Sequence, residues 1–169
     1  MANEDLFIDT AEPDPSEYKD TTPDPEQLKT SPLINRSIVG YLEEVMEGEA
    51  IIRLNCTEDM VADQKGLIHT GFMFSSANYA ALLAVNEPNA ITIVSKVNFL
   101  LPAVLNDEII FKSHAMQTES RKRIVKVDGF IRDNKIFEAE FSIVIMERHI
   151  LNMNLSGIWY NLFGIADDC

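Results

Sequence analysis

The stretch His69–Val85, HTGFMFSSANYAALLAV, contains no aspartate, glutamate, lysine or arginine and is apolar or small at most positions. It predicts a helix from about Gly71 to Val85, because Asn86 suits the C-terminal cap region and Pro88 cannot continue a helix. A helix that is apolar nearly all round is a buried one. The sequence therefore predicts one central helix with the rest of the domain wrapped around it.

Alternating apolar and polar residues flank this helix on both sides. Before it, residues 37–57 indicate two strands joined around Glu47, Gly48 and Glu49. After it, four segments alternate with period two, as expected where one face of a sheet is buried. The predicted inward residues are Ile91, Ile93, Val97 and Phe99; Ile109, Phe111 and Ala115; Val125, Val127 and Ile131; and Phe137, Ala139, Phe141, Ile143 and Ile145. This order predicts an α+β domain in which four strands form an antiparallel meander and the sheet wraps around the helix.

Length, charge and cysteine content limit the classes of function. With 169 residues, 46% of them hydrophobic, the chain fits one domain. A formal net charge of −13 argues against a nucleic-acid partner, because phosphate backbones bind broad basic surfaces. Two cysteines are too few for a disulfide framework and wrongly spaced for a zinc site. No apolar run reaches the roughly 18 residues of a membrane span. We therefore expect a cytoplasmic protein with no metal.

The two ends differ in composition from the predicted domain at residues 33–146. Residues 1–32 are acidic and rich in proline, which predicts a disordered arm that either solvates the protein or serves as an interaction arm. Residues 147–169 are apolar but interrupted by polar side chains. We expect this extension to pack on the body or on a partner subunit, with Trp159, Leu162 and Phe163 as anchors. A partner-binding or membrane-surface role is the alternative.

The run from His69 to Asn78, with its histidine, Gly71 and the Phe-Ser-x-Ala segment at Phe74–Ala77, resembles the hotdog fold of acyl-CoA thioesterases. In that fold a curved antiparallel sheet wraps around one long central helix. The closest pattern is that of the phenylacetyl-CoA thioesterase-like branch, and Phe99, Pro102 and Asp107 match its downstream strand pattern. The likeness covers roughly residues 34–146.

Two positions depart from the family pattern. Thr70 replaces the first of two glycines, and Asn78 replaces an acidic residue nine positions after the histidine. An asparagine at this point also resembles the hotdog effector domain of the bacterial fatty-acid-synthesis repressor, which senses malonyl-CoA without consuming it. Nothing in the chain resembles the DNA-binding domain of that repressor. The chain is also similar to flagellum-co-regulated virulence hotdog proteins of Campylobacter-like bacteria, which have comparable tails.

The resemblance implies that a thioester carbonyl lies at the helix N-terminus, where backbone N–H groups polarise it. Gly71 would supply such an N–H, His69 would orient the loop or contact the thioester, and Thr70 would add a hydroxyl. Asn78 can position a ligand but cannot activate water, because a carboxamide has no accessible basic lone pair. Purely structural roles are the alternative for each residue. Side chains expected to line the substrate are Phe72, Phe74, Ser75 and Tyr79.

Other polar residues are weaker candidates. Asp63, Glu138 and Glu140 do not stand where the family has its acid. The only tight basic cluster, formed by Arg121, Lys122 and Arg123, is expected to bind the phosphates of coenzyme A, unless it is merely a basic turn. Lys112 and His114 share the non-core phase of their strand and are expected to be solvated.

Together these features predict a homodimer, or a higher even oligomer, that binds a coenzyme A thioester as a sensor or binding protein with weak or no hydrolysis. Edge strands of such a sheet invite pairing with a second copy. No cofactor is expected beyond acyl-CoA or coenzyme A as ligand. An active acyl-CoA thioesterase and a dimer scaffold for the two tails are the alternatives.

Overall fold

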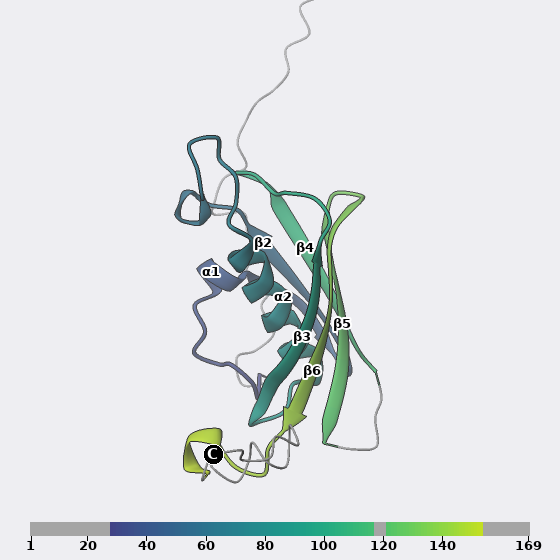
Figure 1. Ribbon diagram of the computed structural model, residues 1–169. Coiled ribbons are helices and arrows are strands. Elements are labelled where there is room, and N and C mark those ends of the chain that lie inside the picture. Colours follow the sequence, from purple (N-terminus) through teal and green to yellow (C-terminus); the bar gives the residue numbers. More distant parts are fainter. Residues whose placement is uncertain (1–27, 117–120, 154–169) are drawn as a thin grey trace, which may run out of the picture.

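The apolar helix predicted from the sequence is the centre of the molecule. In the computed structural model, which describes residues 28–116 and 121–153, helix α2 spans Thr70–Val85 and lies in the concave face of a curved sheet (Figure 1). Asn86 ends the helix in the left-handed conformation, at φ 43°, and its N–H donates to the carbonyl of Leu82. No helix in the described ranges has both the length and the apolar character needed to cross a membrane.

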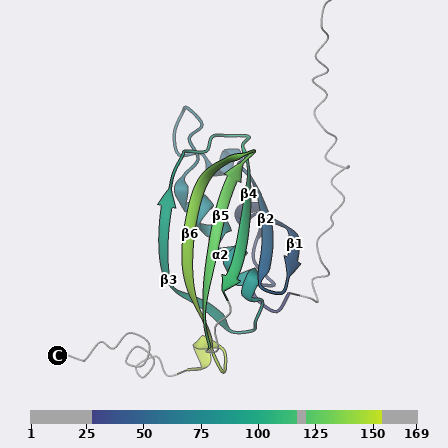
Figure 2. The same cartoon turned by 90° about the vertical axis from the view of Figure 1, so that its right-hand side faces the viewer.

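Six antiparallel strands form the sheet in the order β1-β2-β4-β5-β6-β3 (Figure 2). Their bounds are Tyr41–Met46 for β1, Glu49–Asn55 for β2, Ala90–Phe99 for β3, Glu108–Met116 for β4, Lys122–Ile131 for β5 and Asn134–Ile145 for β6. The prediction that the four strands after the helix form a meander is therefore wrong for the first of them, β3, which does not pair with β4. Strand β2 already occupies the open side of β4, so β3 pairs with β6 at the far edge.

The inward phase predicted for β4, β5 and β6 is confirmed. Ile109, Phe111, Val125, Phe137 and Phe141 are each fully buried beneath α2. The prediction for β3 is wrong where a β-bulge shifts the register between Thr92 and Val94. Thr92 takes the place opposite the buried Ile143 that uninterrupted alternation assigns to Ile93.

The packed body begins earlier than the predicted boundary at residue 33. Leu28 and Thr30 are buried, and the backbone N–H of Lys29 donates to Oδ1 of Asn86 at 2.9 Å. The following residues form a single helical turn, α1 (Arg36–Val39), and not the start of a strand. This turn packs on α2 and leads into β1. The rest of the acidic arm and the anchors Trp159, Leu162 and Phe163 lie outside the described residues.

Two short 3-10 turns complete the described chain. The turn η3 (Glu58–Met60) precedes the loop that enters α2, and η4 (Ile150–Asn152) follows β6. Isolated bridges join Val61 to Ile68 and Leu67 to Val104, so the loop before the helix is tied to the connection between β3 and β4. The N-terminus of α2 therefore lies at the end of the sheet where β3 finishes and β4 starts.

Candidate functional site

One stripe of α2 is only half covered by the chain. Its residues follow the spacing of neighbours on one helix face, whereas most others on α2 are fully buried. The stripe consists of Gly71, Ser75, Asn78, Leu82 and Val85. Three predicted site residues, Gly71, Ser75 and Asn78, thus share a face of the helix that the described residues leave open to a ligand or a second subunit.

His69 caps the N-terminus of α2. Its Nδ1 accepts a hydrogen bond from the N–H of Gly71 at 3.0 Å, and its carbonyl accepts one from the N–H of Phe72. A Cβ atom on residue 71 would lie only 2.8 Å from His69 Nδ1, so glycine is required for the imidazole to sit here. The Gly71 N–H expected to polarise a thioester is therefore already engaged, and a ligand would reach it only after the imidazole rotates.

Asn78 is held from one side by strand β3. The hydroxyl of Thr92 donates to Oδ1 of Asn78 at 2.6 Å, in a half-buried position. The amide nitrogen of Asn78 has no hydrogen-bond partner among residues 28–116 and 121–153. The side chain therefore uses its acceptor within the fold and keeps its N–H donors for another group. Sequence reasoning missed Thr92, because the bulge in β3 is invisible to a period-two pattern.

None of the three acids weighed from the sequence takes the place of a base beside Asn78. Glu138 and Glu140 lie on the outer face of the sheet, turned away from α2, and each forms an ion pair with a lysine there. Lys135, followed by Asn98, holds the pKa of Glu138 below its ordinary value. Asp63 accepts hydrogen bonds from two backbone N–H groups of its own loop.

The aromatic residues expected at the site are spread around α2. Phe74 packs on Phe141 of β6 with ring centroids 5.8 Å apart, and Phe72 meets the ring of His69 edge-on. Tyr79 is 1% exposed and faces Arg36 of α1. Burial raises the pKa of Tyr79, and the charge and the hydrogen-bonding guanidinium of Arg36 oppose this rise. No partner in the described residues meets the Tyr79 hydroxyl at full hydrogen-bond geometry. Tyr79 is thus part of the packing between α1 and α2, and Phe74 borders the half-covered stripe.

The basic cluster of Arg121, Lys122 and Arg123 lies far from the N-terminus of α2 in its own chain. Arg121 donates to Glu147 at 2.5 Å, which lowers the pKa of this carboxyl, and Lys122 begins β5. The carbonyl of Arg121 accepts from the N–H of Ile145 at the end of β6. These strand ends lie beside the C-terminus of α2, whereas His69 lies at its N-terminus. The 16 residues of the helix, at 1.5 Å per residue, separate its two ends by about 24 Å. Within one chain, the structure does not bring Arg121, Lys122 and Arg123 to His69.

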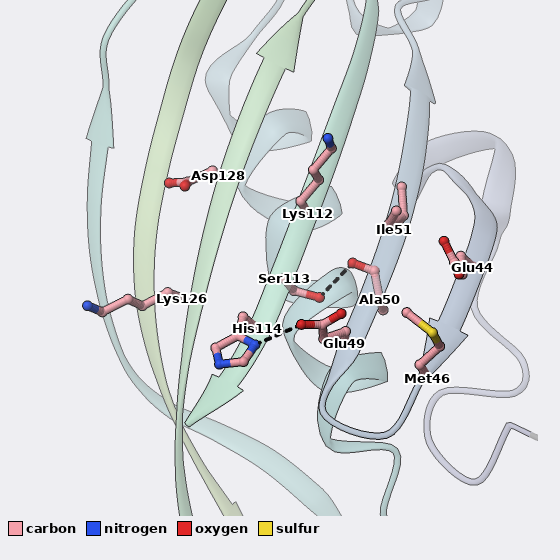
Figure 3. Close-up of a pocket in the computed structure, with 10 residues that line it drawn as sticks. All are labelled: Glu44, Met46, Glu49, Ala50, Ile51, Lys112, Ser113, His114, Lys126 and Asp128. Carbon is pink, nitrogen blue, oxygen red and sulfur yellow. Dashed lines mark hydrogen bonds and ion pairs between the residues drawn. The ribbon is translucent and has the colours of Figure 1, made fainter. Parts of the chain in front are cut away.

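A separate cavity of about 390 Å³ opens on the outer face of the sheet (Figure 3). His114 contacts Glu49 at 3.1 Å, and Lys112 lies 5.7 Å from the centre of the Phe130 ring. The prediction that Lys112 and His114 belong to the non-core phase is confirmed. The cavity is lined by Glu44, Met46, Glu49, Ala50, Ile51, Lys112, Ser113, His114, Lys126 and Asp128. Its two lysines and three carboxylates are mixed, so the lining does not favour an ion of one sign.

Comparison with characterised proteins places the chain among relatives that are longer than itself. Methylthioribose-1-phosphate isomerase of Aquifex aeolicus is 41% identical over 119 residues, which are 70% of this chain and 26% of that protein. Transcription factor FapR of Caldanaerobacter subterraneus is 23% identical over 124 residues, which are 73% of this chain and 62% of FapR. The chain thus spans about a quarter of the first and about three fifths of the second. No family model matches it.

Among solved structures, Cj0977, a sigma28-regulated virulence protein from Campylobacter jejuni, has 36% sequence identity and a TM-score of 0.74. The match covers 76% of this chain and 91% of Cj0977. The chain belongs to the hotdog-fold family of thioesterase-like proteins. This hotdog protein also shares its fold with a hypothetical thioesterase from Streptococcus pneumoniae solved with coenzyme A, at 17% identity, a TM-score of 0.58 and coverage of 64% and 86%. The predicted fold and the family resemblance are confirmed.

Proposed function

We propose that this hotdog protein binds a coenzyme A thioester along the half-covered stripe of α2 and hydrolyses it slowly or not at all. Asn78 carries the proposal. Thr92 already donates to its carbonyl oxygen, whereas its N–H groups have no partner in the described residues, so the group that Asn78 offers a ligand is an amide N–H donor. Such a donor matches the carbonyl oxygen of a thioester, and a carboxamide has no basic lone pair with which to activate water.

The comparisons support the ligand class and a role in binding. The hypothetical thioesterase from Streptococcus pneumoniae was solved with coenzyme A in the same fold, and the match to transcription factor FapR covers 73% of this chain. A sensor or binding protein is consistent with both. The isomerase of Aquifex aeolicus is matched over about a quarter of its length, so its activity does not transfer with the likeness. We place the protein in the cytoplasm, where acyl-CoA is made and used.

Strand β3 is an edge of the sheet formed by the described residues, and this edge supports a homodimer. Large apolar side chains on β3 and the loop after it are 42–50% exposed, namely Val94, Phe99, Leu100, Leu101 and Val104. Pairing β3 with its copy across a two-fold axis would cover part of this surface and join the two sheets. Sedimentation velocity should give a dimer at micromolar concentration, and a monomer would contradict this part of the proposal.

The same pairing would complete the ligand site. Two antiparallel copies of β3 place the end of one strand beside the beginning of the other. The N-terminus of α2 in one protomer would then lie at the same end of the assembly as the basic cluster, Arg121–Arg123, of the partner subunit. Replacing Arg121 and Arg123 by glutamate should weaken acyl-CoA binding by about 1–3 kcal/mol for each lost charge-assisted contact and leave the dimer intact. Unchanged affinity in a calorimetric titration would move the phosphate site elsewhere.

Steady-state kinetics of Asn78→Asp tests the catalytic part of the proposal. The aspartate restores a group that can activate water nine residues after His69, so kcat should rise by roughly 10²- to 10⁴-fold with little change in KM. Asn78→Ala is the matched control, and it should bind more weakly without gaining turnover. If the wild-type protein already works at ordinary thioesterase rates and Asn78→Asp is slower, the asparagine belongs to a working catalytic site and the chain is an enzyme.

A further inference from the structure

Thr92 reaches α2 only because β3 contains an extra residue. On the Phe99 side of the bulge, Val97 and Ser95 pair with Ala139 and Phe141 on the inward phase of the sheet. Continued alternation would turn Ile93 toward the helix. The register shift between Thr92 and Val94 puts Thr92 opposite Ile143, on the inward face. A bulge of this kind re-aims one side chain, and here it replaces an apolar group with a hydroxyl.

The hydroxyl has one hydrogen to donate, and it gives it to Asn78. The distance of 2.6 Å between the two oxygens lies within the ordinary range of an O–H···O hydrogen bond. Neither the Thr92 hydroxyl nor the amide nitrogen of Asn78 has another hydrogen-bond partner in residues 28–116 and 121–153. If the amide turned over, its N–H could donate to the Thr92 hydroxyl oxygen, but the hydroxyl hydrogen and the Asn78 carbonyl would then both lack a partner in the described residues. The pair therefore has one favoured arrangement, in which the Asn78 carbonyl faces β3 and its N–H groups face away from the strand.

We infer that Thr92 is the positioning residue of the ligand site, which fixes the Asn78 amide so that its N–H donates to the thioester carbonyl. This inference rests on the proposed function and adds to it the kind of group that the site recognises. A donor held in place favours a hydrogen-bond acceptor, such as the oxygen of an acyl thioester. It gives no advantage to a coenzyme A derivative whose sulfur carries an alkyl group without a carbonyl.

Paired titrations of the full chain with a thioester and a thioether test the inference. The probes are an acyl-CoA and the S-alkyl-CoA of equal chain length, which lacks only the carbonyl oxygen. Thr92→Val removes the hydroxyl at nearly constant volume and should weaken thioester binding by roughly 2- to 10-fold, the value of one net hydrogen bond, while thioether binding stays the same. Thr92→Ser should restore the wild-type preference. Ser95→Ala removes an exposed hydroxyl from the same strand and should change neither affinity.

A vibrational measurement reads the same contact directly. With a ¹³C-labelled thioester, the carbonyl stretch of the bound ligand should lie below that of the free ligand in the wild type and in Thr92→Ser. It should move back toward the free value in Thr92→Val. Should Thr92→Val fail to fold, Thr92→Ala serves in both measurements.

The possible outcomes separate the inference from the proposed function. If the wild type binds neither probe, the proposed function fails and the inference fails with it. If the wild type binds the thioester but Thr92→Val keeps full affinity and an unshifted stretch, only the inference is overturned. A Thr92→Val protein that loses both probes equally would show that Thr92 supports the structure of the site without orienting Asn78.

Discussion

The cap at the mouth of α2 makes the effect of Gly71→Ala depend on residue 69. With His69 present, a Cβ on residue 71 would lie 2.8 Å from Nδ1 and push the imidazole out of its hydrogen bond. Loss of an N-cap costs about 1 kcal/mol. Alanine in place of glycine in a helix contributes about 0.5–1 kcal/mol in the opposite direction. The two effects nearly cancel, and we expect Gly71→Ala to lower the free energy of unfolding by only about 0–0.5 kcal/mol.

In a His69→Ala background the cap is already absent, and the new methyl group meets no ring. The same substitution should then raise the free energy of unfolding by about 0.5–1 kcal/mol, so its sign reverses. The difference between backgrounds, about 1 kcal/mol, is the coupling between the two residues. Urea unfolding at one fixed protein concentration would show it as a midpoint difference of roughly 0.3–1 M. An equal effect of Gly71→Ala in both backgrounds would refute the cap as the reason for this glycine.

Three further predictions concern the packing of the body. Leu28→Ala should lower the free energy of unfolding by about 2–3 kcal/mol because Leu28 is only 6% exposed. The control Leu33→Ala, at a residue that is 97% exposed, should change it by less than about 0.5 kcal/mol, and equal effects of the two substitutions would show that Leu28 is not part of the core. Tyr79→Phe should leave the Tm unchanged or higher, since no partner in the described residues meets the hydroxyl at full hydrogen-bond geometry, and a marked drop would show that its interaction with Arg36 stabilises the fold. Burial, followed by the charge of Asp107, raises the pKa of the Cys56 thiol from 9.0 to about 12. In a Cys169→Ser variant the native thiol should therefore resist Ellman's reagent at pH 8, and the free energy of unfolding should fall as the pH rises from 9 toward 12. Fast labelling of the folded protein would contradict this.

The features that the sequence predicts well are those set by local periodicity and caps. The apolar run of α2, ended by Asn86, and the alternation in β4, β5 and β6 depend on neighbouring residues alone. Strand order depends on which edges are already occupied, and no local pattern reports that β2 has taken the side of β4. The alternating pattern therefore predicts a meander of four strands, whereas in the structure only β4, β5 and β6 form one.

At the site, residue types were predictable but their partners were not. The helix face shared by Gly71, Ser75 and Asn78 follows from their spacing. The hydrogen bond from Thr92 does not, because a single extra residue in β3 changes which side chain faces the helix. Composition places Leu28 and Thr30 in the arm, yet both are buried and Leu28 belongs to the hydrophobic core. Burial of these two residues at the end of an acidic, proline-rich segment is a tertiary effect that composition cannot report.

Equilibrium dialysis with a doubly labelled acyl-CoA tests the central claim most directly, with one label in the acyl group and one in the nucleotide. The account predicts that both labels stay with the wild-type protein in equal amounts and are recovered as intact thioester after long incubation. Asn78→Ala should retain roughly tenfold less ligand, as expected for the loss of one hydrogen bond at the upper end of its usual range. Release of the acyl label at ordinary thioesterase rates, or equal retention by Asn78→Ala, would contradict a binding site built on Asn78.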